Sequence, residues 1–299
     1  MTASLLFSPL ALRGLTLKNR LVISPMCQYS AEDGMANDWH FAHLARFALG
    51  GAGTVFVEAT AVQPEGRITY GDLGLWQDSQ IVPLARIARF LKAEGATPAI
   101  QLGHAGRKAS TQRPWHGNGP LDAADRTRGE TPWPVVAPSA VALGEGWLTP
   151  AALQSGDLAE LRAAWHRATL RARDAGFEIV EVHGAHGYLL NSFLSPLTNR
   201  RNDAYGGDLA GRMRFPLEIA EIVRAAWPGD RPVFFRVSAV DGVEGGSSIE
   251  DTVTLARALH ERGIDVIDCS SGGIAGSATA ARIPRTPGFQ VPFAERIKR

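Results

Sequence analysis

The chain has 299 residues, of which 45% are hydrophobic and 20% are charged. These proportions are typical of soluble globular proteins and exclude the disordered and fibrous classes. Its 31 basic and 30 acidic residues leave a formal charge of +1, so no strong field favours nucleic acid or an anionic membrane as a partner. Only Cys27 and Cys269 occur, which excludes a disulfide framework and any site built on clustered thiolates.

The first residues, MTASLLFSPLALRGL, lack the basic segment and the cleavage site of a secretory signal. No uninterrupted apolar stretch approaches the roughly 18 residues that span a bilayer. We therefore expect a cytoplasmic protein without a membrane partner.

Short β-branched apolar runs alternate with longer amphipathic segments along the chain. Near-continuous apolar runs suit parallel strands that are buried on both faces, and the alternation predicts repeated βα units in a single barrel domain over residues 1–299. The predicted strands are residues 21–26, 53–60, 98–104, 178–184, 232–239 and 265–272. The predicted helices are residues 37–49, 80–94, 155–175, 215–227 and 248–262.

One segment, residues 106–155, interrupts this rhythm and is rich in Pro, Gly and Trp. It is too long for a plain connection, and loops of that length are usually functional or disordered. Three tryptophans, Trp115, Trp133 and Trp147, favour an ordered loop. We expect it to pass over the mouth of the barrel.

Polar side chains collect where the predicted strands end, which is where α/β barrels carry their chemistry. The sharpest feature is H-x-x-H at His183 and His186, followed by Tyr188. The histidines could be metal ligands, donors that polarise a carbonyl oxygen, or side chains satisfied by nearby backbone. A phenol with an ordinary pKa of about 10 can donate a proton but is a poor base.

Three further residues at strand ends have open roles. Arg236 ends an apolar strand, so it either forms a structural ion pair or faces an anionic ligand. The carboxamide of Gln101 can donate and accept, as the edge of a heterocycle demands. Cys27 is either a buried apolar residue or a thiol that touches a ligand. The sequence GGIAGS at 272–277 could cradle a phosphate or be a flexible loop.

Longer motifs in the same order along the chain resemble the Old Yellow Enzyme family, in its thermophilic-like or xenobiotic reductase branch. They cover the chain nearly end to end. The motifs are SPMCQYS (24–30), GRITYGDLGLW (66–76), IQLGHAGRK (100–108), VEVHGAHGYLLNSFLSPLTNRRNDAYGG (180–207), FFRVSA (234–239) and DCSSGG (268–273).

The resemblance implies a (β/α)8 TIM barrel that binds FMN noncovalently and is a dimer or tetramer. It implies NADPH or NADH as reductant and an activated alkene, an α,β-unsaturated carbonyl compound, as substrate. Hydride would pass from flavin N5 to the alkene, and Tyr188 would supply the proton. His183 and His186 would bind the carbonyl oxygen, with Tyr29 and Cys27 also lining the substrate pocket. The residues implied to bind FMN are Ser24, Pro25, Met26, Cys27, Ala61, Gln101 and Arg236.

The chain departs from this family at its end. Residues 292–299 fit the helix after the sixth strand, and strands seven and eight, whose loops bind the FMN phosphate in the family, do not follow. We therefore expect a barrel truncated after the sixth βα unit. Two alternatives stay open: a metal-dependent barrel hydrolase that uses His104, His183 and His186, or an inactive fragment of the flavoenzyme.

Overall fold

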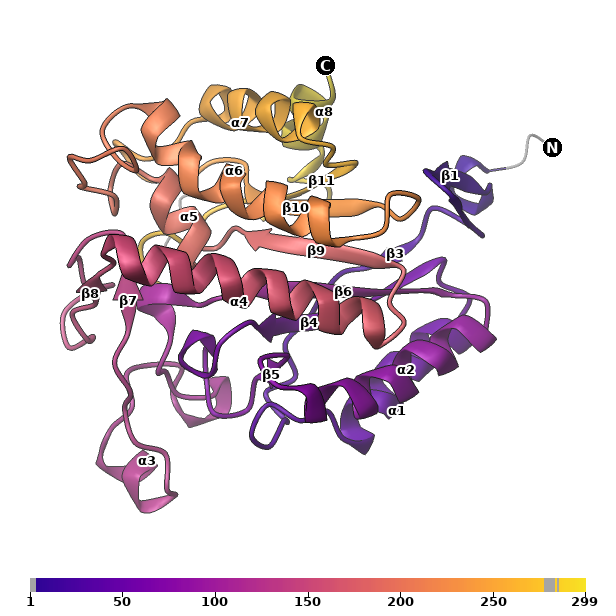
Figure 1. Cartoon of the computed structure of the whole chain (residues 1–299), viewed down its shortest axis with the longest axis horizontal. Coiled ribbons are helices and arrows are strands. Elements are labelled where there is room, and N and C mark those ends of the chain that lie inside the picture. Colours follow the sequence, from indigo (N-terminus) through magenta and orange to yellow (C-terminus); the bar gives the residue numbers. More distant parts are fainter. Residues whose placement is uncertain (1–3, 277–282, 284) are drawn as a thin grey trace.

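The computed structural model describes residues 4–276, 283 and 285–299. Its main sheet has seven strands in the order β11-β10-β9-β6-β4-β3, with β5 paired to β4, and all of these pairs are parallel (Figure 1). The strands are β3 (Val22–Ile23), β4 (Thr54–Ala61), β5 (Leu73–Gly74), β6 (Thr97–Gly103), β9 (Ile179–Gly184), β10 (Val233–Ser238) and β11 (Val266–Ser270).

Six helices follow one another around this sheet, each packed against the next in chain order (Figure 1). Parallel strands need such crossover helices, which cover the outer face of the sheet. The helices are α1 (Asp38–Leu49), α2 (Ile81–Ala93), α4 (Ser155–Asp174), α6 (Leu209–Ala226), α7 (Ile249–Glu261) and α8 (Val291–Lys298). The result is an α/β fold with a curled parallel sheet, as the alternation predicts.

The strands bury both faces because successive side chains alternate between them. Outward residues such as Val180 and Val182 join the large core under the helices, which includes the fully buried Trp165. Inward residues of the sheet, Phe56, Ala99, Ile179 and Phe234, form a second, smaller core together with Leu17. Leu17 comes from the hairpin of β1 (Leu10–Leu12) and β2 (Leu15–Leu17). This hairpin lies at the end of the sheet opposite the arrowhead of β9 (Figure 1).

Several boundaries differ from the prediction. The first strand of the main sheet, β3, is only two residues long, because the chain from Ser24 to Ser30 is not paired. The helix expected at 215–227 begins six residues earlier, at Leu209, where Asp208 accepts a hydrogen bond from the backbone of Gly211. Residues 189–194 form an unpredicted helix, α5 (Leu189–Leu194).

The long segment at 106–155 contains α3 (Ala123–Thr127) and a parallel pair of β7 (Val136–Ala137) and β8 (Ala151–Ala152). Several contacts tie it to the rest of the chain, among them two hydrogen bonds near its middle. The Trp133 indole donates to Glu65 O at 3.0 Å, and Arg201 Nη1 donates to Pro138 O at 3.0 Å. Within the described ranges, no helix is long and apolar enough to cross a membrane.

Candidate functional site

Every second side chain of each strand points to the inner face of the curled sheet. On β9 the three inward positions are Ile179, Glu181 and His183, running from the apolar floor towards the carboxyl end. The register places Gln101 and Phe234 beside Glu181 on the neighbouring strands. It places Arg236 of β10 beside His183, and Asp268 of β11 beside Arg236.

Two of the predicted cofactor residues, Gln101 and Arg236, lie on this inner face. Gln101 is 1% exposed, and its amide nitrogen donates to Glu181 Oε1 at 2.7 Å. Arg236 Nε lies 3.2 Å from Asp268 Oδ2. The structural ion pair considered for Arg236 is therefore present, and the buried Nε still has no hydrogen-bond partner among the described residues.

His183 lies at the end of β9 and is 4% exposed. Its Nδ1 accepts a hydrogen bond from Ala185 N at 3.2 Å, so a neutral ring carries its proton on Nε2. Burial, together with the charges of His186, Arg236 and Lys108, lowers the pKa of His183 well below its usual value. The ring is therefore a neutral donor at physiological pH.

His186 occupies a left-handed backbone conformation, with φ of +61°. Its amide donates to Ser238 Oγ at 2.9 Å, and its Nε2 lies 2.5 Å from Ser270 Oγ. Burial, with the positive charges of Arg236 and Lys108, lowers the pKa of His186 to about 3. Strained backbone at a non-glycine residue is often found where function requires it.

Tyr188 is the N-cap residue of α5. Its ring packs edge-on against His183, with centroids 4.9 Å apart and planes at 81°, and the two histidine rings are 5.1 Å apart. Burial raises the pKa of Tyr188, and the neighbouring Cys27 and Asp72 add to this effect. The phenol therefore keeps its proton.

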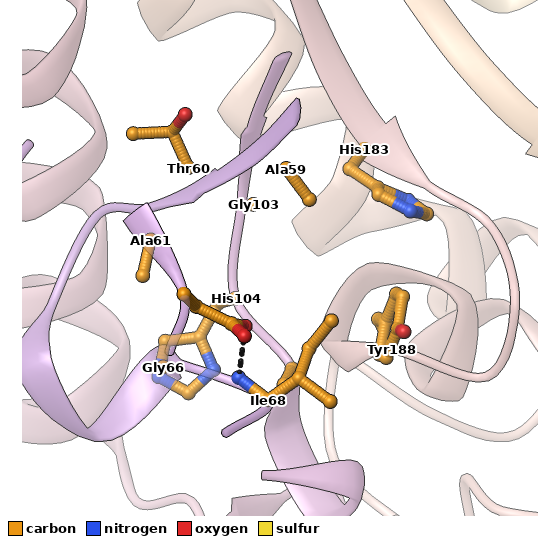
Figure 2. Close-up of a pocket in the computed structure, with 11 residues that line it drawn as sticks. Ala59, Thr60, Ala61, Gly66, Ile68, Gly103, His104, His183 and Tyr188 are labelled. Carbon is orange, nitrogen blue, oxygen red and sulfur yellow. Dashed lines mark hydrogen bonds between the residues drawn. The ribbon is translucent and has the colours of Figure 1, made fainter. Parts of the chain in front are cut away.

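A cleft opens beside this cluster, where about 240 Å³, open solvent included, is free of protein atoms. Figure 2 shows His183 and Tyr188 on one side of it, with Ala61 and His104 across from them. Three predicted site residues, Ala61, His183 and Tyr188, therefore share one cleft. Its remaining lining residues are Ala59, Thr60, Gly66, Ile68, Asp72, Gly103 and Ala105.

The unpaired chain after β3 carries the other predicted cofactor residues. Ser24 is exposed and Pro25 is half-buried, whereas Met26 leaves 44% of its surface exposed although it is apolar. Cys27 is a free thiol, and burial raises its pKa, helped by the carboxyl groups of Glu58 and Asp72. This thiol is therefore held protonated.

Tyr29 also has a left-handed backbone, with φ of +51°. Arg113 from the long segment donates to its carbonyl at 3.2 Å and forms an ion pair with Glu130. The Tyr29 ring lies edge-on to Trp115 at 6.1 Å. The long segment thus holds Tyr29 in place.

Two residues that the sequence places just after the third strand have roles that sequence reasoning missed. Lys108 Nζ donates to His186 O at 2.9 Å and to Gly273 O at 3.0 Å. Arg107 donates to the carbonyls of Ala142 and Ile274. The sequence signal for these roles was a pair of adjacent cations shortly after a fully buried strand. In the GGIAGS segment, the carbonyl groups of Gly273 and Ile274 thus accept hydrogen bonds from Lys108 and Arg107. Ser277, the last residue of that segment, lies outside the described residues.

The metal alternative lacks a ligand set among the residues that the structure describes. His104 also lines the cleft, but its Nδ1 accepts from Gly106 N at 3.0 Å. In the part of the chain that the structure describes, no three His, Cys, Asp or Glu side chains form a group that could hold a metal ion. The metal-dependent hydrolase is therefore not favoured.

Known proteins match this chain along most of its length. The model of the NADH:flavin oxidoreductase / NADH oxidase family matches residues 5–294. The NADPH dehydrogenase of Halalkalibacterium halodurans is 45% identical over 295 residues, which are 98% of this chain and 79% of that protein. The NADPH dehydrogenase of a Geobacillus species is 44% identical over 298 residues, which are 99% of this chain and 80% of that protein.

Solved structures of two proteins are also similar to this chain in fold. Morphinone reductase is 28% identical with a TM-score of 0.78, over 100% of this chain and 79% of that one. The Old Yellow Enzyme homologue of Zymomonas mobilis is 25% identical with a TM-score of 0.75, over 91% of this chain and 74% of that one.

The two dehydrogenases and morphinone reductase align with 98–100% of this chain, and the chain spans 79–80% of their own length. These alignments do not establish the expected truncation after the sixth βα unit. The cofactor of the family is FMN, and its reductant is a nicotinamide dinucleotide. The chain belongs to the NADH:flavin oxidoreductase / NADH oxidase family and is an enzyme of the Old Yellow Enzyme type.

Proposed function

We propose that this enzyme reduces the C=C bond of α,β-unsaturated carbonyl compounds. In this reaction His183 and His186 bind the carbonyl oxygen, and Tyr188 gives a proton to the carbon next to the carbonyl group. The observation that carries the proposal is the packing of a neutral histidine pair against a protonated phenol at the edge of one cleft.

The residues at the strand ends fit FMN. The buried Nε of Arg236 lacks a hydrogen-bond partner among the described residues. The amide nitrogen of Gln101 is occupied by Glu181, which leaves its carbonyl for a ligand. An exposed apolar Met26 and the small Ala61 suit the face of a flat ring. We propose that FMN is held by Ser24, Pro25, Met26, Cys27, Ala61, Gln101 and Arg236.

Bound FMN would supply the hydride, and the protein's part is to bind and polarise the alkene. Negative charge develops on the carbonyl oxygen as the alkene is reduced. The Nε2–H of a neutral His183 can donate to that oxygen, and preorganised donors in a dry site stabilise such charge strongly. A neutral histidine suits this role because burial keeps its proton state fixed across physiological pH.

Tyr188 is suited to be the acid because its proton is held by burial until the substrate carbon becomes basic. Tyr29 and Cys27 would form another wall of the substrate pocket. We also propose that the sheet belongs to a (β/α)8 barrel, that residues 106–155 pass over its mouth, and that the enzyme is a dimer or tetramer.

Two substitutions test these roles. Replacing His183 by Ala should weaken the binding of a phenol to the oxidised flavoprotein at least tenfold, while His166→Ala, an exposed histidine on α4, should not. Tyr188→Phe should leave flavin reduction by NADPH intact and slow alkene reduction by about 10²–10⁴-fold. Equal phenol affinity in His183→Ala and wild type, or an unchanged alkene step in Tyr188→Phe, would contradict the assignment.

A further inference from the structure

Two carboxyl groups and one guanidinium lie close together on the inner face of the sheet, and one of them, the carboxyl group of Glu181, is fully buried. Glu181 on β9 is 0% exposed. Gln101 faces it from β6, Arg236 from β10 and Asp268 from β11. One positive charge therefore has two possible counter-charges.

The contacts assign that positive charge to Asp268. Arg236 Nε lies 3.2 Å from Asp268 Oδ2, and no ion pair involving Glu181 occurs among the described residues. Glu181 has one hydrogen bond, from the neutral amide of Gln101, and its Oε2 has no partner in the described part of the chain. A buried carboxylate supported by a single neutral donor is costly, and such groups take up a proton instead.

The direction of the pKa shift of Glu181 agrees with these contacts. Burial, followed by the charge of Asp268, raises the pKa of Glu181 to about 8, although Arg236 and the hydrogen bond from Gln101 oppose the shift. At neutral pH the cluster then carries no net charge, with Arg236 balanced by Asp268 alone.

We propose that Glu181 is a positioning residue of the FMN site that acts as a neutral carboxylic acid. It fixes the side chain of Gln101 so that the amide carbonyl is left for the cofactor, and its neutrality prevents a second negative charge beside Arg236. This inference rests on the proposed roles of Gln101 and Arg236 in FMN binding and not on the proposed alkene chemistry.

The first test measures the dissociation constant of FMN by flavin fluorescence between pH 6 and pH 9. In the wild type, ionisation of Glu181 should weaken FMN binding on the order of tenfold as the pH passes about 8, because a new negative charge faces Arg236. Glu181→Gln, which mimics the neutral acid, should lack this loss. Glu160→Gln, an exposed change on α4, should follow the wild type.

The second variant separates positioning from space filling. Glu181→Leu keeps the volume but removes the acceptor for Gln101, so FMN should bind at least tenfold more weakly than to Glu181→Gln at pH 7. If Glu181→Leu binds FMN as Glu181→Gln does, Gln101 is not positioned by Glu181. If Glu181→Gln keeps the wild-type pH dependence, Glu181 is not the group that titrates. Either result overturns the proposal.

A third measurement does not depend on flavin. The folded state holds a proton on Glu181 up to about pH 8, whereas the unfolded chain releases it near pH 4.3. This contribution to stability is complete below the unfolded pKa and is lost as the pH rises through the folded pKa. Between these values the unfolding constant should gain about a tenfold rise per pH unit. Urea titrations of Glu181→Gln should show a pH slope smaller by one proton, and an equal slope would contradict the neutral acid.

Discussion

The loop after β11 supports the backbone of His186, and Gly273→Ala tests this contact. Gly273 has φ of +94°, and a Cβ there would lie 2.6 Å from His186 Cα and 2.7 Å from its carbonyl carbon and oxygen. These are backbone atoms, so no side-chain rotation can relieve the overlap. The positive φ costs roughly 1–2 kcal/mol with a Cβ, and overpacking adds about 1–3 kcal/mol. The substitution should therefore lower the free energy of unfolding by about 2–5 kcal/mol.

Gly146→Ala provides the matched control, because Gly146 has φ of +78° but no atom within 4 Å of the added Cβ. It should cost only the backbone term of roughly 1–2 kcal/mol. Urea unfolding measures both variants, and phenol titration reports the site. Gly273→Ala should weaken phenol binding at least tenfold through displacement of His186, whereas Gly146→Ala should not. Equal effects of the two variants on both measurements would refute the supporting contact.

Two further predictions concern the core and the pH dependence of stability. Trp165 is 0% exposed, so Trp165→Ala should lower the free energy of unfolding by about 3–5 kcal/mol; Trp39→Ala, where the side chain is 60% exposed, should cost far less, and similar losses would contradict the packing described. Burial lowers the pKa of His104 to about 4, so the unfolded chain takes up this proton first and stability falls as the pH drops from about 6.5 towards 4. In His104→Asn, the side-chain oxygen can replace Nδ1 as acceptor for Gly106 N. Urea titrations of this variant should show a pH dependence of the free energy of unfolding that is smaller by one proton in this range. An unchanged slope would count against a neutral buried His104.

The fold was largely predictable because its strands and helices differ strongly in period and length. The predicted strand at 178–184 and the observed β9 (Ile179–Gly184) differ by only one residue. The agreement is close because an apolar run that ends at a glycine leaves little choice in where the strand begins and ends. The strand predicted at 21–26 was too long. Its apolar composition reflects Met26 at the site, where the chain is unpaired and exposed.

The site was predictable where strand ends mark it, and less so where it depends on contacts between distant loops. His183 and Tyr188 could be grouped because His183 lies at the end of one predicted strand and Tyr188 follows the same strand. The hydrogen bond from Lys108 to the carbonyl oxygen of His186 joins residues that are 78 positions apart in the sequence. Only the path of two loops brings these residues together. No local pattern specifies such a contact.

The structure also explains how one strand can serve stability, charge and chemistry at once. Along β9, Ile179 belongs to the inner apolar core, Glu181 accepts the hydrogen bond from Gln101, and His183 lines the cleft. Between them, Val180 and Val182 pack under the helices. A slip of one residue in register would turn both valines into the site and the carboxyl group into the helical core. The apolar packing of the outer face therefore fixes the register that places His183 beside Tyr188, so substitutions that loosen this core should disturb the site before they unfold the chain.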